Sequence, residues 1–178
     1  MKTYLSIDLD YWFYRDYDNY QLQTKMLECF DFFAELLKTR QVFSVDLIIN
    51  HEDILSILKN SNFDLLINID YHDDICYKNY TELNCGTWAK FVEGRNNKTY
   101  QWNYPVPLRF SYGRCDTQND LWHYPKLHTD WKKIRKYKGL PSLRNMKIDG
   151  ICIVLSPPYI NRDINIYKVS DVLRKLMQ

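Results

Sequence analysis

The sequence is short of the residues and runs that mark several protein classes. Only five of its 178 residues are glycine, and neither a repeat nor a low-complexity segment is present. No run approaches the roughly 18 apolar residues of a membrane span, and the first residues lack the apolar core of a signal peptide. We therefore expect a cytoplasmic protein that does not contact a membrane. The cysteines are odd in number and no two form a Cys-x-x-Cys pair, which argues against a disulfide framework and a zinc ribbon: Cys29, Cys76, Cys85, Cys115 and Cys152.

The charge balance is equally uninformative about large partners. With 24 basic and 22 acidic residues the formal net charge is +2, so composition predicts neither a nucleic-acid binder nor an acidic tail. The length and the 46% hydrophobic content indicate a single globular domain over residues 1–178, large enough to bury a core. Function must therefore be sought in local sites.

The most informative stretch is 65–74, where a short apolar run ends in three acids and a histidine. The apolar part is typical of a buried strand in an α/β sheet. Asp70, His72 and Asp74 follow it at alternate positions. Open α/β sheets bind ligands at the carboxyl ends of their strands, and carboxylates with an imidazole suit a divalent metal. The alternative is a polar loop in which Asp73 or Asp74 caps the next helix.

Two further predicted strands end in similar residues. The strand at 3–7 is followed by Asp8 and Asp10, and the strand at 42–49 is followed by Asn50 and His51. Singly, the two aspartates fit an ordinary turn, and His51 fits a solvated position in the first turn of a helix capped by Asn50. Parallel strands, however, bring their carboxyl ends to one edge. We therefore predict a three-layer αβα sandwich with a mostly parallel sheet and six ligand-type residues gathered at one edge.

The remaining segments predict packing more than chemistry. Amphipathic patterns indicate helices at 22–40 and 164–177, and 148–155 reads as a buried strand. A loop near residue 80 leads into a helix expected from Asn84 to Gly94. The stretch 95–139 is poorly periodic and mixes aromatic with basic residues, which can bind single-stranded nucleic acid. We favour a solvated helix face for the basic run 132–138, and the region offers a surface that a peptide could contact. His123 and His128 lack the spacing of a zinc motif.

Five segments together resemble a known family: SIDLDYW, NHEDIL, NIDYHDDI, TELNCGTW and IDGICIVLSPPY. They resemble the ureohydrolases, the arginase and agmatinase superfamily, and more closely the small arginase-like family that includes the peptide arginases of ribosomal peptide biosynthesis. In classical ureohydrolases the Asp-x-Asp strand follows the Asp-x-His-x-Asp strand, whereas here it comes first, so the order looks circularly permuted. Those enzymes also carry a proton-shuttling histidine shortly after Asp-x-His-x-Asp, and the matching stretch 82–88 has none.

The resemblance implies an arginase-like fold with two manganese ions. Asp8 and Asp70 would bridge the ions, His51 and Asp74 would complete one site, and Asp10 and His72 the other. The charge of four carboxylates balances that of two divalent ions. An oxygen-rich ligand set favours manganese over zinc because manganese is the harder ion. Two such ions would lower the pKa of a shared water and so supply hydroxide at neutral pH. Glu82 and Asn84 would contact the substrate, although Glu82 fits a helix start equally well.

The implied activity is conversion of arginine residues in a precursor peptide to ornithine with release of urea. Two alternatives stay open at this point. One is a non-catalytic relative that binds peptides, and the other is an amidinohydrolase of a free small guanidine. Nothing in the sequence indicates an oligomeric state.

Overall fold

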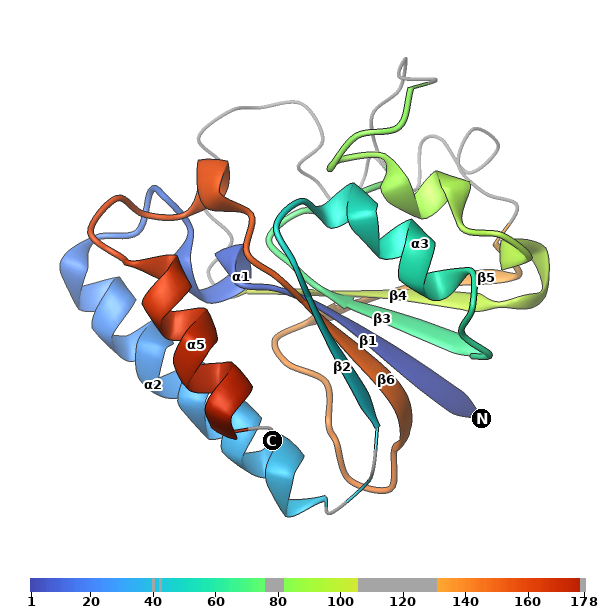
Figure 1. Ribbon diagram of the computed structural model, residues 1–178, viewed down its shortest axis with the longest axis horizontal. Helices are drawn as coiled ribbons and strands as arrows, with labels where there is room; N and C mark the ends of the chain where they lie inside the picture. Colours follow the sequence, from blue (N-terminus) through green and yellow to red (C-terminus); the bar gives the residue numbers. More distant parts are fainter. Residues whose placement is uncertain (40, 42, 76–81, 106–130, 177–178) are drawn as a thin grey trace.

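The protein is an α/β fold around a six-stranded, all-parallel sheet (Figure 1). The structure, a computed structural model, describes residues 1–39, 41, 43–75, 82–105 and 131–176. The strand order is β2-β6-β1-β3-β4-β5. The strands are β1 (Lys2–Asp8), β2 (Ser44–Ile48), β3 (Leu65–Ile69), β4 (Thr99–Tyr104), β5 (Lys133–Lys138) and β6 (Lys147–Val154).

The central strands form because their side chains can be buried on both faces. Every residue of β3 is buried, as are all residues of β1 except Lys2, which is the pattern expected of a parallel sheet covered on two sides. β6 lies between β1 and β2. Its Gly150 is required by close packing, because a Cβ there would lie 2.4 Å from a ring carbon of Tyr4. The strands predicted at 3–7, 42–49, 65–69 and 148–155 are all confirmed within a few residues.

Helices cover both faces of this sheet. On one face, α1 (Asp10–Phe13), α2 (Asn19–Lys38) and α5 (Ile166–Leu176) pack over one core cluster; on the other, α3 (Ile54–Leu58) and the 3-10 helix η2 (Trp88–Phe91) pack over a second (Figure 1). Short 3-10 turns complete the described elements: η1 (His51–Asp53), η3 (Arg95–Asn97) and η4 (Pro157–Tyr159). The arrangement is consistent with the predicted three-layer sandwich.

Helix boundaries follow local chemistry. The Asp18 side chain accepts a hydrogen bond from the backbone N–H of Gln21, and the Gln21 side chain accepts one from the backbone N–H of Asp18. This reciprocal cap starts α2 three residues before the predicted position. The helix expected between Asn84 and Gly94 is wrong in extent, because only the short η2 forms there. In the described part of the chain no helix is long and apolar enough to cross a membrane.

The aromatic and basic stretch is the main correction to the sequence-based fold. The run 132–138 is not a solvated helix face, because Lys133–Lys138 forms the edge strand β5. Among the described aromatic residues of 95–139, Tyr137 is 49% exposed, but four others are buried in the core: Tyr100, Trp102, Tyr104 and Trp131. Residues 106–130, which include His123 and His128, lie outside the described residues.

Candidate metal centre

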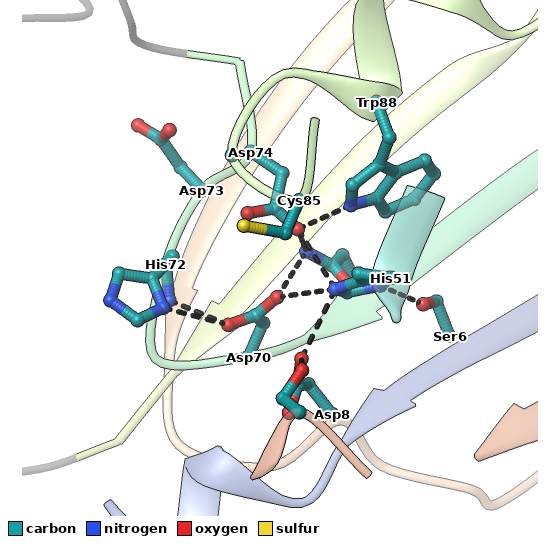
Figure 2. A network of polar contacts seen from close by, with 12 residues as sticks. Ser6, Asp8, His51, Asp70, His72, Asp73, Asp74, Cys85 and Trp88 are labelled. Atoms are coloured by element: carbon teal, nitrogen blue, oxygen red, sulfur yellow. Dashed lines mark hydrogen bonds and ion pairs between the residues drawn. The ribbon is translucent and has the colours of Figure 1, made fainter. Parts of the chain in front are cut away.

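All six predicted ligand residues line one cavity of about 260 Å³ at the carboxyl edge of the sheet. Asp8 ends β1 and Asp10 begins α1, His51 begins the turn after β2, and the other three follow β3 directly. The remaining described lining residues are Asn84, Cys85, Gly86, Ser156 and Tyr159. Parallel strand ends therefore gather the acids and imidazoles, as the sequence predicts (Figure 2).

Asp70 lies at the centre of the cluster, with one carboxylate oxygen directed to each side. Its Oδ2 is 3.2 Å from His51 Nδ1, and its Oδ1 is 3.6 Å from His72 Nδ1. Two groups of residues have ligand atoms within 4.8 Å of one another, Asp8 with His51 and Asp70, and Asp10 with Asp70 and His72. Asp70 belongs to both groups, which is the position of a carboxylate that bridges two ions.

The first group is built around His51. Its Nδ1 lies 3.2 Å from Asp8 Oδ2 and 3.1 Å from Asp74 Oδ2, so three carboxylates including that of Asp70 face one nitrogen. The other nitrogen, Nε2, is 2.7 Å from the hydroxyl of Ser6. A hydrogen bond at the outer nitrogen of a metal-binding histidine fixes the ring and its tautomer. His51 is therefore held with Nδ1 facing the cluster.

The second group is more open. His72 Nδ1 lies 3.0 Å from Asp10 Oδ2, and the backbone N–H of Tyr71 donates to Asp10 Oδ1. The His72 side chain is 33% exposed, whereas the carboxylate and imidazole side chains of the first group are at most 4% exposed. The rings of Tyr14, Tyr71 and Tyr159 lie with centroids 5.2 to 5.8 Å from that of His72. The two halves thus differ in access to solvent.

Side chains outside the two groups hold the carboxylates in place. The indole N–H of Trp88 donates to Asp74 Oδ2, and the Trp88 ring lies over His51 with centroids 4.6 Å apart. The Asn68 amide donates at 3.2 Å to the Oδ2 atoms of both Asp70 and Asp74. The Ser156 hydroxyl donates to Asp8 Oδ2. Such outer partners fix ligand geometry before an ion binds.

The backbone at this site also departs from ordinary conformations. Asp74 and Ser156 have φ values of 58° and 43°, in the left-handed region that residues with a Cβ rarely adopt. Both side chains contribute to the cluster, Asp74 directly and Ser156 through Asp8. Residues held in this region cluster at functional sites, where the surrounding structure compensates for their strain.

The electrostatics of the cluster favour bound positive charge. Burial alone would lower the pKa of His51, but the carboxylates of Asp74, Asp70 and Asp8 raise it well above its ordinary value. Burial would likewise lower the pKa of His72, but the carboxylates of Asp10 and Asp70 raise it well above its ordinary value. Protonated imidazoles are therefore stable here only because the acids surround them.

The carboxyl groups of the cluster differ in the direction of their pKa shifts. Burial raises the pKa of Asp10 well above its ordinary value, and the charges of Asp8 and Asp70 add to this effect. Burial likewise raises the pKa of Asp74, with a further contribution from Asp70. Burial opposes ionisation of Asp70 too, but its hydrogen bonds and charge pairing with His51 and His72 lower its pKa below the usual range.

The residues present fit a pair of divalent cations. Four buried carboxylates in one cavity can all be ionised together only where cations neutralise them. Asp10 Oδ2 is buried and accepts no hydrogen bond from the described residues, although it lies 3.0 Å from His72 Nδ1. An ion between these atoms would satisfy both. The oxygen-rich donor set suits manganese or another hard divalent ion.

The two residues assigned to the substrate are placed differently. Asn84 lines the cavity, where its Oδ1 accepts a hydrogen bond from the backbone N–H of Gly86. Glu82 is exposed and is not among the lining residues; its backbone carbonyl accepts a hydrogen bond from Thr87 Oγ1. Asp73 is buried, but its carboxylate points away from the cluster in Figure 2 and its Oδ1 accepts from the backbone of Ile75.

Several site residues escaped the sequence analysis. Ser6 and Asn68 are polar residues inside apolar strands, at paired positions of β1 and β3, and a buried polar residue in such a run is a usable signal. Trp88 and Ser156 carry no comparable signal, because tryptophan is ordinary in a core and serine is ordinary after a strand. Their role depends on the tertiary fold.

Comparison with protein families, with curated proteins and with solved structures finds no match to this chain. What the fold and the site define is a class: a parallel α/β protein with a buried carboxylate and imidazole cluster at the carboxyl edge of its sheet.

Proposed function

We propose that this protein is a manganese-dependent hydrolase that converts arginine residues of a precursor peptide to ornithine and releases urea. The observation that carries the proposal is the position of Asp70, whose two carboxylate oxygens face the two imidazoles separately. This arrangement supports a dinuclear centre that Asp70 bridges, with His51 and Asp74 completing one site and Asp10 and His72 the other. Asp8 belongs to the first ligand group alone, so its predicted role as a second bridge gains no support from the geometry.

A guanidinium group requires such a centre, because its carbon is a poor electrophile with charge spread over three nitrogens. When bound, two divalent ions supply hydroxide at neutral pH. The protein contributes position and desolvation. The carboxylates of Asp10, Asp70 and Asp74 line the buried part of the cavity, where they would hold the ions beside the substrate.

The size of the cavity supports a substrate that enters by one side chain. About 260 Å³ lies below the roughly 300–1,000 Å³ of pockets that enclose a drug-sized ligand. A single arginine side chain is a suitable occupant, and the rest of a peptide would stay outside. The preference for a peptide over free arginine otherwise rests on the resemblance of the five sequence segments. The buried aromatic residues of β4 lend it no support.

The test is a mass measurement. Purified protein is incubated with manganese and a synthetic peptide that contains one arginine, and the product should be lighter by about 42 Da, because urea leaves and water is added. Urea release should match the mass change. Free arginine is assayed in parallel. Efficient turnover of free arginine without any change in the peptide would support the proposed metal chemistry and refute the assignment of a peptide substrate. Protein that binds two manganese ions and hydrolyses neither would support the non-catalytic alternative.

A further inference from the structure

Three protic side chains on the cavity wall lie outside the ligand residues. Among the described lining residues, these side chains are those of Cys85, Ser156 and Tyr159. The Ser156 proton is used in its hydrogen bond to Asp8. The Cys85 sulfur lies 3.2 Å from the Tyr159 hydroxyl oxygen, so a thiol and a phenol form one hydrogen-bonded pair beside the cluster.

The thiol is held in a well-anchored turn. The backbone N–H of Gly86 donates to Asn84 Oδ1, the N–H of Thr87 donates to the Asn84 carbonyl, and Thr87 Oγ1 donates to the Glu82 carbonyl. The next residue is Trp88, whose indole N–H bonds Asp74 (Figure 2). The turn is thus tied directly to the metal cluster, and Cys85 is not a side chain on a free loop.

The partner of the thiol comes from a different wall. Tyr159 ends η4 (Pro157–Tyr159), which follows the left-handed residue Ser156, and its ring lies 5.2 Å from that of His72. The hydrogen bond between Cys85 and Tyr159 therefore joins the two sides of the cavity. A substrate that reaches the cluster enters the same cavity that this pair lines.

Hydrolysis of a guanidine needs an acid at this place. When the bond from the guanidine carbon Cζ to Nε breaks, the electron pair goes to Nε, and an alkylamine leaves only if Nε is protonated. The cluster residues begin the reaction without an acidic proton of their own, because metal ligands are deprotonated carboxylates and neutral imidazoles. The outer nitrogen of His51 is also engaged by Ser6.

We propose that Cys85 is the general acid of the reaction, with Tyr159 as its proton relay; the proposal rests on the proposed function. Hydroxide forms a bond to Cζ, the Cζ–Nε bond breaks, and the Sγ proton moves to Nε. The proton that the new C–OH group loses as urea forms returns to sulfur through the Tyr159 hydroxyl or water, so the thiol is regenerated. A thiol is a stronger acid than an alkylammonium ion, so the transfer to the departing nitrogen is downhill.

The experiment compares two peptides that differ only in the leaving group. One contains arginine and the other contains canavanine, in which oxygen replaces the carbon next to Nε and makes the departing nitrogen far less basic. General acids contribute about 10²–10⁴-fold to rate. Cys85→Ala should therefore lower kcat on the arginine peptide by about 100-fold or more and leave turnover of the canavanine peptide within a few-fold of the parent protein.

Two further variants separate acidity from structure. Cys85→Ser keeps a hydroxyl that can bond Tyr159 but is a much weaker acid, so it should reproduce the selective loss on arginine. Tyr159→Phe keeps the thiol and should give a smaller loss that is again confined to the arginine peptide. Manganese binding, measured by calorimetry, should be unchanged in all three variants, because Cys85 and Tyr159 belong to neither ligand group.

The outcomes distinguish the two proposals. If the parent protein hydrolyses neither peptide, the proposed function is refuted, and with it the role of Cys85 as general acid. An active parent protein whose Cys85→Ala variant loses equal activity on both peptides, or loses none, keeps the function and overturns the role of Cys85. Full arginine turnover by Cys85→Ser also overturns it.

Discussion

Replacing Asp70 with asparagine should abolish the stabilisation that manganese gives, whereas the same change at Asp73 should preserve it. Asp70→Asn keeps the size of the side chain and removes the charge that lies between the two imidazoles. Asp73→Asn makes the same chemical change four residues from the end of β3, at a buried carboxylate outside both ligand groups. The pair separates loss of a bridging ligand from loss of a buried charge.

The expected magnitude follows from binding linkage. An ion present at 100 times its dissociation constant stabilises the folded state by about 2.7 kcal/mol, so two independent ions contribute about 5 kcal/mol. For a chain of this length 1 kcal/mol corresponds to roughly 2–4 °C in Tm. The parent protein and Asp73→Asn should therefore gain about 10–20 °C with manganese, and Asp70→Asn should gain little, because both ions lose their shared ligand.

The assay is thermal unfolding with and without manganese, accompanied by calorimetry for the number of bound ions. The quantity compared is the increment that the metal produces, because the Asp70 charge also pairs with the imidazoles in metal-free protein and its loss lowers stability there. An Asp70→Asn variant that keeps the full increment would refute the bridging position. A loss in Asp73→Asn as large as that in Asp70→Asn would show that the wrong acids have been chosen.

Two other expectations can be checked by solution measurements. Because the pKa values of His51 and His72 are raised in the folded protein, their stabilisation of metal-free protein is complete below about pH 6.5 and is lost as the pH rises through the raised values. Urea titrations should show that the free energy of unfolding falls above neutral pH, by at most about 1.4 kcal/mol per pH unit for each histidine. Saturating manganese should reverse this trend. Stability that rises with pH in metal-free protein would contradict the directions of the pKa shifts. Ser156→Ala, which removes the hydrogen bond to Asp8, should weaken manganese binding in calorimetry by about 10–100-fold, and Ser142→Ala at an exposed position should leave it unchanged; equal affinities in the two variants would show that the hydroxyl does not orient the carboxylate.

The central strands were predictable because burial on both faces leaves a strong pattern. β3 is a continuous run of buried residues, and β1 is similar, so periodicity alone located them. β4 alternates aromatic residues with Gln101 and Asn103, whose side chains hydrogen-bond each other, and this pattern is not apolar enough to read as a core strand. β5 lies at the edge and carries basic residues, as edge strands commonly do. Its charges therefore resembled a solvated helix face.

The same distinction holds within the site. The six ligand-type residues follow strand ends, so the rule for parallel sheets was sufficient to bring them together. The residues that orient them depend on strand order and side-chain direction, which a single sequence does not contain. Ser156 reaches Asp8 only because β6 lies beside β1, and Trp88 reaches Asp74 across 14 residues of chain. Glu82 had the right neighbours in sequence but is exposed in the fold.

The position of β6 has a consequence for how the protein is made. β1 and β2 are not neighbours in the sheet, because β6, which is synthesised last of the six strands, lies between them. Until residues 147–154 leave the ribosome, the strand that carries Asp8 and the strand that leads to His51 have no common partner in the sheet. The four acids lie at or just after the ends of β1 and β3, which pair directly, so these acids can gather before β6 is made, whereas His51 cannot yet be held beside them. Insertion of the last strand is therefore the step that joins β2 to the rest of the sheet and adds His51 to the acids.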